Sequence, residues 1–328
     1  MKNQVKIGDV ILANNVITAP MAGITDRPFR EELHKMGPGL VFTEMISDKA
    51  LTYKNCNTLA LLDIKGEEVP VAVQLCGSEP QVMSRAAQIA EEMGAAIIDI
   101  NMGCPAPKII KNGEGAALML DEEMATEIVK QVIRAVRIPV TVKMRAGFSQ
   151  ANINATSLAQ KVEAAGAAAI TVHGRTRDQF YHGLADWQVV QKVAAKVSVP
   201  VFGNGDIYEA QDALGKLQMA GCAGVMLGRG IQGNPWLVQQ IAAVMQKNPE
   251  PAKPSISEIM LTIKRQLGRE VELDGEERGI RKMRKHIAWY IKGYRNAALM
   301  RNKINQAQNL PELLAMLTAY EQELQQVN

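Results

Sequence analysis

The sequence lacks several features that mark membrane-spanning, secreted or zinc-binding proteins. It contains no run of about 18 consecutive apolar residues, so we expect no transmembrane helix. Residues 1–10 carry charges and a glycine in place of the apolar core of a signal peptide, and we therefore expect a cytoplasmic protein without a membrane partner. The four cysteines form neither a CxxC pair nor a zinc spacing, so we expect no bound metal; they are Cys56, Cys76, Cys104 and Cys222.

Acidic residues are absent from one stretch near the C-terminus. Between Arg278 and Lys303 there are nine Lys and Arg residues and no Asp or Glu. Residues 251–328 hold 13 basic and nine acidic residues, whereas the rest of the chain is nearly balanced, with 24 and 25. A charge run is ordinarily a solvated helix face, but a face without interspersed acids favours contact with the phosphate backbone of RNA.

The basic stretch also has the apolar period of a helix. Apolar residues at alternating spacings of three and four predict a stripe that packs on a core: Ile280, Met283, Ile287, Tyr290 and Tyr294. The basic residues fall largely outside this stripe. Among them, we predict that Arg281 and Lys285 bind the substrate.

Short apolar runs alternate with segments of helical period over most of the chain. Several helical segments end at a glycine suited to a left-handed C-cap, namely Gly94, Gly166 and Gly221. Eight runs have the unbroken hydrophobicity of strands buried on both faces: Val16–Ala19, Leu40–Thr43, Val71–Leu75, Ile97–Ile100, Val140–Val142, Ala169–Val172, Val201–Phe202 and Val225–Leu227. The pattern predicts an α/β protein with a closed (β/α)8 TIM barrel. An open doubly wound sheet is the alternative, but no GxGxxG follows the first strand.

The pattern changes after Trp236. Residues 246–257 contain three prolines and have the composition of a linker. Beyond them the helical period continues to about Leu324, with a turn near Gly275. We therefore predict a barrel at residues 1–247, a linker at 248–257 and a small all-helical C-terminal domain at 258–328.

Polar or small residues follow nearly every predicted strand. In a TIM barrel the carboxyl ends of the strands share one mouth, where the chemistry takes place. The residues at these ends are Pro20-Met21-Ala22, Glu44, Gln74, Asn101 with Cys104, Lys143 with Arg145, His173 with Arg175, Asn204-Gly205-Asp206 and Gly228-Arg229. Any one of them alone would be an ordinary loop residue, but all eight sets together indicate a functional site.

The loops after the seventh and eighth strands predict a phosphate site. They read GNGD at 203–206 and GRG at 228–230. Glycine lets backbone N–H groups approach phosphate oxygens closely, and Arg229 adds a bidentate charge. Asp206 has a competing interpretation as the N-cap of the following helix.

Lys143 and Gln74 extend this prediction to a planar ring. Lys143 has three interpretations: a Schiff-base lysine, a cation beside an electron-rich ring, or a structural partner of Glu44 or Asp99. Gln74 can both donate and accept, which suits the imide edge of a heterocycle. A phosphate, an imide edge and a cation across one mouth favour FMN.

Cys104 lies on the loop after the fourth predicted strand. An ordinary thiol has a pKa of about 8.5 and is mostly protonated near neutral pH, which makes it a usable general acid. A helix N-terminus or a cation that lowered the pKa would make it a nucleophile instead. A buried loop cysteine without a role is the ordinary alternative, and the place at the mouth favours a catalytic one.

These segments together resemble the tRNA-dihydrouridine synthase family, and in detail its bacterial B-type branch. The matching stretches cover the whole barrel: 19–30 (APMAGITDRPFR), 74–77 (QLCG), 99–105 (DINMGCP), 143–145 (KMR), 173–177 (HGRTR), 204–207 (NGDI) and 228–230 (GRG). Residues 284–290 (RKHIAWY) also resemble that branch. The combination is highly specific, whereas no single piece is.

The resemblance implies an FMN cofactor, NADPH as electron donor and tRNA as substrate. Reduced FMN would pass a hydride to C6 of uracil, and Cys104 would protonate C5. The implied flavin-binding residues are Pro20, Met21, Ala22, Gln74, Lys143, His173, Asn204, Gly205, Asp206, Gly228 and Arg229. We expect Asn101, Arg145 and Arg175 near the substrate, and the helical domain on the tRNA, because the uridine must leave its stack to reach the barrel. We expect a monomer.

Other functions stay open at this stage. A free-pyrimidine flavin enzyme of the dihydroorotate dehydrogenase type shares the fold and the cofactor, but needs no basic helical domain. Dihydrouridine synthesis in ribosomal RNA and an aldolase that uses Lys143 are further alternatives. An RNA-binding protein with the barrel as a mere scaffold is opposed by the polar strand ends.

Overall fold

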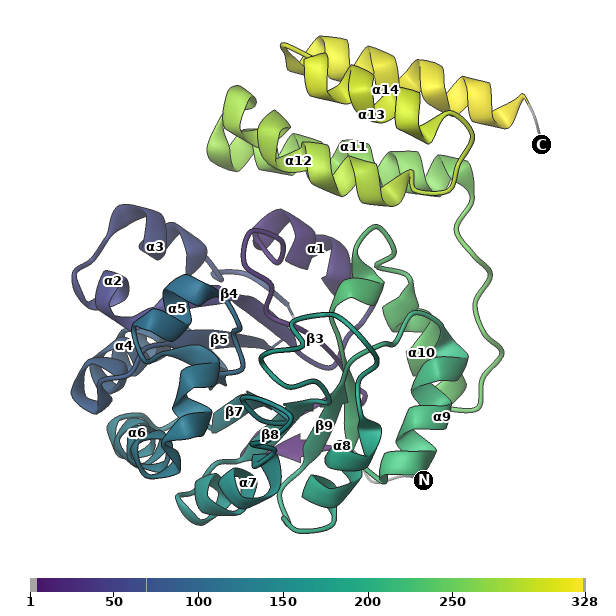
Figure 1. The fold of residues 1–328 in the computed structure, drawn as a ribbon. Coiled ribbons are helices and arrows are strands. Elements are labelled where there is room, and N and C mark those ends of the chain that lie inside the picture. The colour runs from purple at the N-terminus through teal and green to yellow at the C-terminus, as the bar shows by residue number, and fades with distance from the viewer. Residues whose placement is uncertain (1–4, 69, 327–328) are drawn as a thin grey trace.

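Eight parallel strands form the centre of the molecule and close into a barrel (Figure 1). The computed structural model describes residues 5–68 and 70–326. The strands are β3 (Val16–Thr18), β4 (Val41–Ser47), β5 (Val71–Cys76), β6 (Ile97–Met102), β7 (Val140–Arg145), β8 (Ala169–His173), β9 (Val201–Asn204) and β10 (Gly224–Leu227). They pair in the order β3-β10-β9-β8-β7-β6-β5-β4, and a parallel bridge between Ile17 and Leu40 joins the two ends. The predicted barrel is confirmed.

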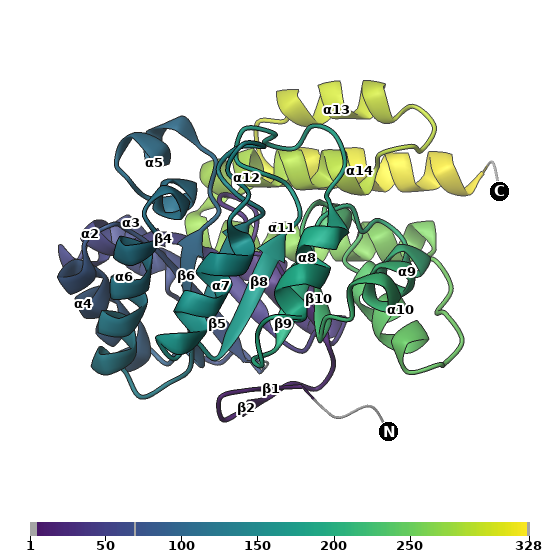
Figure 2. The same cartoon turned by 60° about the horizontal axis from the view of Figure 1, so that its bottom comes forward.

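The amino-terminal end of the barrel is filled and covered. A buried cluster inside the barrel combines inward residues such as Phe42, Phe202 and Met226 with Leu12 from the preceding segment. A hairpin of β1 (Lys6–Ile7) and β2 (Val10–Ile11) lies across this end (Figure 2). The polar residues that follow the strands lie at the other end, where a ligand can enter.

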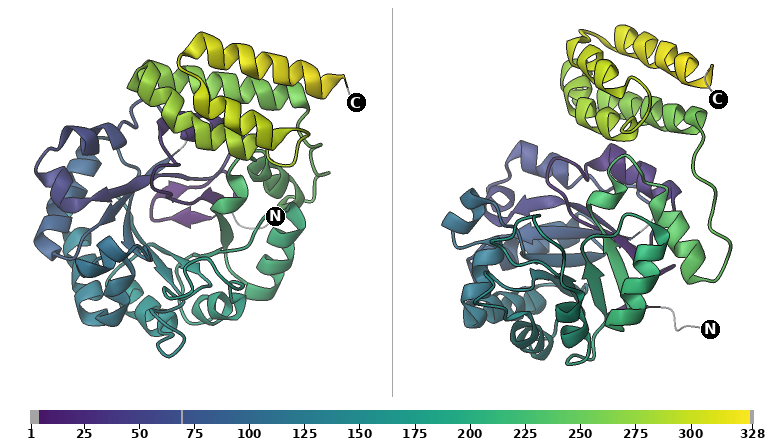
Figure 3. Two further views of the ribbon diagram at one scale, coloured as in Figure 1. Left: turned by 45° about the horizontal axis from the view of Figure 1, so that its top comes forward. Right: turned by 45° about the vertical axis from the view of Figure 1, so that its right-hand side comes forward.

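Four helices after the barrel form a layer on one side of it (Figure 3). They are α11 (Ile256–Asp274), α12 (Glu276–Tyr290), α13 (Ala297–Gln306) and α14 (Leu310–Gln325). A capping box between Ser255 and Glu258 starts α11, and Gly275, with φ of 80°, makes the expected turn into α12. The predicted stripe is buried in α12, although its last member, Tyr294, follows the helix and is only half-buried.

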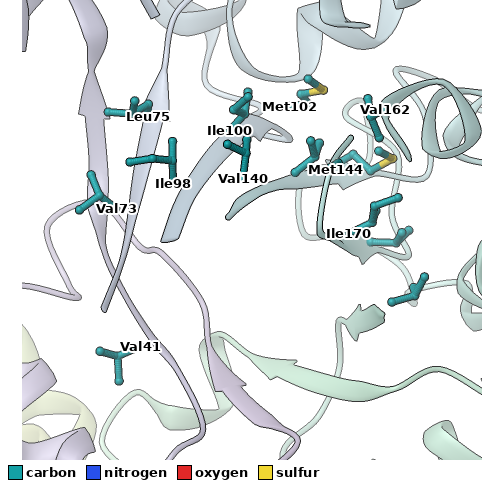
Figure 4. Close-up of a cluster of buried hydrophobic side chains, with 14 of the residues drawn as sticks. Val41, Val73, Leu75, Ile98, Ile100, Met102, Val140, Met144, Val162 and Ile170 are labelled. Carbon is teal, nitrogen blue, oxygen red and sulfur yellow. The ribbon is translucent and has the colours of Figure 1, made fainter. Parts of the chain in front are cut away.

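Helices surround the barrel and pack on the outward faces of its strands. They are α1 (Arg27–Lys35), α2 (Asp48–Thr52), α3 (Cys56–Leu61), α4 (Pro80–Glu92), α5 (Pro107–Lys111), α6 (Glu122–Ala135), α7 (Ala155–Ala164), α8 (Trp187–Ala194), α9 (Ala210–Ala220) and α10 (Leu237–Met245), with 3₁₀ turns η1 (Gly115–Leu120) and η2 (Arg229–Ile231). Figure 4 shows part of the cluster between strands and helices, including Val73, Ile98 and Val162. Gly94, Gly166 and Gly221 have the positive φ predicted for them.

The helical tail is joined to the barrel by charge and by apolar contact. Arg265 and Arg269 of α11 form ion pairs with Glu32 and Glu31 of α1. Trp236, which precedes α10, belongs to the buried cluster of the tail rather than to that of the barrel. Within the residues described, no helix is long and apolar enough to span a bilayer.

A candidate active site at the carboxyl ends of the strands

A cavity of about 400 Å³ opens at the carboxyl ends of the barrel strands, a size typical of small-molecule sites. Most of the site residues predicted from the sequence line it: Pro20, Met21, Ala22, Gln74, Asn101, Cys104, Lys143, Arg145, His173, Asn204, Gly205, Asp206, Gly228 and Arg229. They come from strands and loops spread over more than 200 positions of the sequence. Barrel closure therefore brings them together.

A chain of amide hydrogen bonds crosses the floor of the cavity. The amide nitrogen of Asn101 donates to Gln74 Oε1 over 2.7 Å, and Gln74 Nε2 donates to Asp99 Oδ2 over 2.7 Å. Thr141 donates to the other oxygen of Asp99. Gln74 is thereby fixed in one orientation, and it retains one N–H and one lone pair for a ligand.

Asn101 also shapes the loop that carries Cys104. Its Oδ1 accepts hydrogen bonds from the backbone N–H groups of Gly103, at 3.1 Å, and Cys104, at 2.9 Å. Arg145 holds the same loop from the other side, because its Nε donates to the Gly103 carbonyl over 2.8 Å. The thiol of Cys104 therefore has a defined position at the wall of the cavity.

The thiol of Cys104 is kept in its protonated form. Burial raises its pKa, and this effect outweighs the N–H of Ala106 and the positive charges of Arg145 and Lys143, which lower it. The alternative of a nucleophilic thiolate is therefore not favoured by the surroundings. A half-buried thiol that stays protonated at neutral pH is suited to donate a proton.

Lys143 is a buried cation at the strand end. Burial lowers its pKa to about 8, with Arg145 contributing repulsion and Asp99 opposing both. Its Nζ donates to Asn204 Oδ1 over 3.3 Å. Glu44 is not its partner, because the Glu44 carboxyl lies near Asp26 and accepts from the N–H of Gly23. Lys143 is thus positioned to face a ligand in the cavity.

Asp206 organises the proposed phosphate loops. Its carboxylate accepts two hydrogen bonds from Arg175 Nη2, at 2.7 and 2.8 Å, one from the N–H of Ala185, and one from Arg229 Nη2 at 3.2 Å. Burial raises its pKa, but the Ala185 N–H and Arg175 together bring the pKa below its ordinary value. A carboxylate only accepts, so the side chain of Asp206 is suited to orient Arg229, and only its backbone N–H could bind a phosphate directly.

The alternative role of Asp206 as a helix N-cap is wrong. The following helix α9 begins at Ala210, and Glu209 occupies its N-cap position. Asp206 itself has a positive φ of 53° and turns its carboxylate back toward the barrel loops. Three residues separate it from the helix start, which is too far for a cap.

Arg175 and Arg145 are buried and hold the loop between β8 and α8. Arg175 donates to the carbonyls of His182 and Gly183, and Arg145 to those of Thr176 and Phe180. Arg175 is only 2% exposed and does not line the cavity, so the structure does not bring this predicted substrate residue to it. Its guanidinium instead fixes the loop.

Tyr181 is a cavity residue that the sequence reasoning missed. It is half exposed at the tip of this loop, with the guanidinium of Arg229 at 4.9 Å from the ring centroid and that of Arg145 at 5.7 Å. The only signal in the sequence was an aromatic residue in a long polar loop that follows a strand end. An exposed aromatic ring at a cavity mouth offers a surface on which a planar ring can stack.

His173 contributes a neutral ring to the same wall. Burial, followed by the nearby charges of Lys143 and the arginines, lowers its pKa well below the ordinary value. Its Nε2 lies 3.5 Å from Arg175 Nη1. A side-chain Cβ at Gly205, where φ is 124°, would lie 2.6 Å from Ala185 Cβ and 3.0 Å from this ring, which explains the glycine.

The basic residues of α12 are acid-free in sequence, but in the folded protein some of them contact groups of other elements. Arg281 is exposed, and Lys285 donates to the carbonyl of Gly23, next to the cavity wall. Lys282 instead faces acidic groups, with Asp274 only 2.6 Å away. The acid-free run is therefore partly neutralised by α11, and the residues left for an outside partner are fewer than the sequence suggested.

The fold and the cavity define a class of protein: a TIM barrel with a cavity at the carboxyl ends of its strands that combines a cation, a protonated thiol, an arginine and glycine-containing loops. No cluster of three or more metal-ligating side chains occurs in the part of the chain that the structure describes. The chemistry available from side chains is proton donation and charge stabilisation.

Comparison with known proteins narrows this class. A family model described as dihydrouridine synthase matches residues 17–326. A probable tRNA-dihydrouridine synthase of Rickettsia conorii is 42% identical over 302 residues, which cover 92% of this chain and 91% of the relative. The tRNA-dihydrouridine synthase B of Pseudomonas aeruginosa is 38% identical over 306 residues, or 93% and 92% of the two chains. That of Vibrio cholerae is 39% identical over 315 residues, or 96% and 98%.

The chain belongs to the dihydrouridine synthase family. The resemblance inferred from its motifs is confirmed, and the relatives include proteins of the B type. The match extends through α14, so it covers the helical tail as well as the barrel.

Proposed function

We propose that this protein reduces uridine to 5,6-dihydrouridine in tRNA, with FMN as cofactor and NADPH as electron donor, in the cytoplasm. The observation that carries the proposal is the protonated thiol of Cys104 in one cavity with the buried cation of Lys143. The names of the relatives, which specify tRNA, support the same reaction.

The cavity fits FMN by the chemistry of its donors. Arg229 and the glycine-containing loops around it suit the phosphate, because they offer a guanidinium and accessible backbone. Gln74 retains one donor and one acceptor for the imide edge of the ring, and Lys143 offers positive charge beside it. When bound, FMN supplies hydride transfer between NADPH and the pyrimidine.

Cys104 is proposed to donate its proton to C5 of the uracil. Asn101 and Arg145 hold its loop, so the thiol is placed before the substrate arrives. The uracil N–H and carbonyl groups find polar partners in the same wall, where Asn101 keeps one N–H and Arg145 keeps its second terminal nitrogen. Both residues therefore orient the loop and face the substrate.

The helical tail is proposed to bind the tRNA backbone. A uridine inside folded RNA must leave its stack to enter the cavity, at a cost of a few kcal/mol. Arg281, Arg295 and Lys292 are exposed and available to phosphates that offset this cost. Lys285, bonded to the loop at Gly23, lies where the tail and the mouth of the cavity meet.

The decisive experiment is an anaerobic half-reaction. The purified protein is reduced with NADPH, and flavin absorbance is followed after addition of tRNA that lacks dihydrouridine. Reoxidation by this tRNA, and not by free uridine, orotate or ribosomal RNA, is expected. Reoxidation by one of the other substrates would replace the proposed one, and a protein that binds no flavin would refute the proposal.

Two cysteine variants test the proton donor. Cys104→Ala is expected to keep flavin binding and NADPH oxidation but to lose uridine reduction, by about 10²- to 10⁴-fold, the usual contribution of a general acid. Cys56→Ala is the matched control, because Cys56 is exposed and does not line the cavity. Normal reduction of tRNA by Cys104→Ala would exclude the assigned role.

A further inference from the structure

A buried cluster of charged side chains lies where the helical tail meets the barrel. Asp26, the N-cap of α1, and Glu270 of α11 are 6% and 0% exposed. Lys282 of α12 reaches both, with Nζ 3.5 Å from Asp26 Oδ2 and 3.3 Å from Glu270 Oε2. The same Nζ lies 2.6 Å from Asp274 Oδ2. One ammonium group therefore serves three carboxyl groups.

The other charged groups around this cluster do not balance it. Glu44 of β4 adds a fourth carboxyl close enough to Asp26 to be affected by its charge. Arg278 lies 3.8 Å from Asp274 and is 54% exposed, so it offsets that outer carboxylate only. Lys285 binds a backbone carbonyl, and it acts on the cluster through its charge alone. The buried part of the cluster carries an excess of carboxyl groups.

His286 of α12 does not supply the missing positive charge. Its ring packs between Phe29 of α1 and Trp289, with centroids 5.2 Å from each. Burial lowers its pKa to about 4, although the charge of Asp26 opposes this. Neither ring nitrogen has a hydrogen-bond partner among the described residues. His286 is therefore a neutral spacer at neutral pH.

Excess buried carboxyl groups are relieved by protonation of one of them. Glu270 Oε1 is buried without a hydrogen-bond partner in the described part of the chain, and Asp26 Oδ2 has only the 3.5 Å ion pair with Lys282, so a proton between the two groups would satisfy both oxygens. Burial first, and the neighbouring Asp26 second, raise the pKa of Glu270 to about 9. Glu270 is the member that holds the proton.

We propose that Glu270 is a positioning residue: protonated and paired with Asp26, it fixes helix α12, and the basic residues that α12 exposes, against the mouth of the barrel. The pair bridges the first loop of the barrel, which contributes Met21 and Ala22 to the cavity, and the tail. The consequence for RNA rests on the proposed function, whereas the acid pair itself does not.

The proton on Glu270 makes the stability of the folded protein fall as pH rises. In the unfolded chain Glu270 is an ordinary carboxyl with a pKa of about 4.3. The stability that its proton contributes is fully present below that pKa and is lost as pH rises through about 9, where the folded protein releases the proton. Within this window each pH unit raises the unfolding equilibrium constant by about tenfold through this one group.

The first experiment measures unfolding by denaturant in the full-length protein between pH 6 and pH 10. Glu270→Gln mimics the neutral acid and cannot release a proton. The rise of its unfolding equilibrium constant with pH is therefore expected to be smaller than in the wild type, by about tenfold per pH unit up to the folded-state pKa of Glu270. Glu277→Gln, an exposed position at the start of α12, is the control and is expected to follow the wild type. Parallel curves for Glu270→Gln and the wild type would overturn the proposal.

Asp26→Asn provides a second variant should Glu270→Gln fold poorly. It keeps an oxygen for the N–H of Phe29 and removes the charge that disfavours ionised Glu270. The loss of stability with rising pH still begins at the unfolded-state pKa of Glu270, but it is expected to level off at a lower pH than in the wild type, because the folded-state pKa is lower. Levelling off at the same pH as in the wild type would contradict a shared proton.

The second experiment separates KM from kcat for tRNA at pH 7 and pH 9.5. In the wild type KM is expected to rise by about tenfold at the higher pH, as the unprotonated pair loosens α12, and Glu270→Gln is expected to keep its KM. The kcat of both proteins is expected to fall together, because Lys143, with a pKa of about 8, loses its charge in both. An equal rise of KM in both proteins would exclude a positioning role for Glu270. Inactivity of both proteins on tRNA would refute the proposed function, and the unfolding measurements would still test whether Glu270 and Asp26 share a proton.

Discussion

Removal of the Arg175 guanidinium, at a residue outside the cavity, should strongly destabilise the protein. Its Nη2 contacts both carboxylate oxygens of Asp206 and the Gly183 carbonyl, and its Nε donates to the carbonyl of His182, all in a largely buried setting. Truncation of one partner of a buried pair costs about 3–5 kcal/mol. At roughly 2–4 °C per kcal/mol, the value for chains of about 150–250 residues, Arg175→Ala should lower Tm by about 6–20 °C.

The same change should weaken FMN binding. Freed from Arg175, the Asp206 carboxylate would draw Arg229, which already lies 3.2 Å away, and so compete with a phosphate for its charge. Thermal unfolding and flavin fluorescence titration measure the two effects, with the exposed Arg134→Ala as control, expected within about 0.5 kcal/mol of wild type. Arg175→Lys restores charge but not the fork and should fall between. A Tm within 2 °C of the control would refute the reasoning, since about 3 kcal/mol is its minimum.

Three further predictions concern the cavity. Gly115→Ala places a Cβ 2.9 Å from the Cys104 carbonyl at a φ of 61°, so uridine reduction should fall at least about tenfold while NADPH still reduces the flavin. Gly113→Ala is the control, because its φ of 74° gives the same backbone strain without a close contact. Equal activity of the two variants would exclude the steric cause. Lys143→Met should abolish turnover yet raise the Tm of the flavin-free protein at pH 7, because burial of the cation, with a pKa of about 8, destabilises the fold below that pH. The difference in Tm between variant and wild type should vanish toward pH 10, where Lys143 is neutral in the folded protein. A lower Tm of the variant at every pH would contradict this. If the Tyr181 ring stacks on the substrate, Tyr181→Ala should raise KM for tRNA by about tenfold, whereas Tyr181→Phe should keep the wild-type KM. Tyr53→Ala, at an exposed position, is the control and should leave KM unchanged. An equal rise of KM in Tyr181→Phe would assign the binding role to the hydroxyl instead of the ring.

The barrel and most of the cavity could be predicted because their signals are local. Each buried strand is a short apolar run, and a closed parallel barrel sends the end of every run to one mouth, so no knowledge of pairing was needed to group Gln74, Lys143 and Arg229. The C-cap glycines and the capping box at Ser255 are equally local.

The rest depends on partners far away in the sequence. Nothing near Arg175 shows that it binds Asp206, which lies 31 positions away, and Glu32 meets Arg265 across 233 positions. The charge run of α12 suggested a wholly free basic face because the acids that neutralise Lys282 lie on α11 and α1. Asp206 was given an N-cap alternative for the same reason: its sequence neighbours suit one, but its spatial neighbours are arginines.

Closure of the barrel by β3 and β10 sets an order on chain synthesis. Val16 pairs with Val225, so the first strand of the barrel has to wait, unpaired on one edge, until nearly the whole barrel has left the ribosome. Pairings of such long separation form slowly and leave sheet edges exposed in the meantime. Arg229 follows β10 directly, so the loop proposed to hold phosphate is made at the moment of closure. The proposed cofactor could therefore bind a nascent chain only after the last strand is in place, and α1 must stay uncovered until the tail, synthesised last, reaches it.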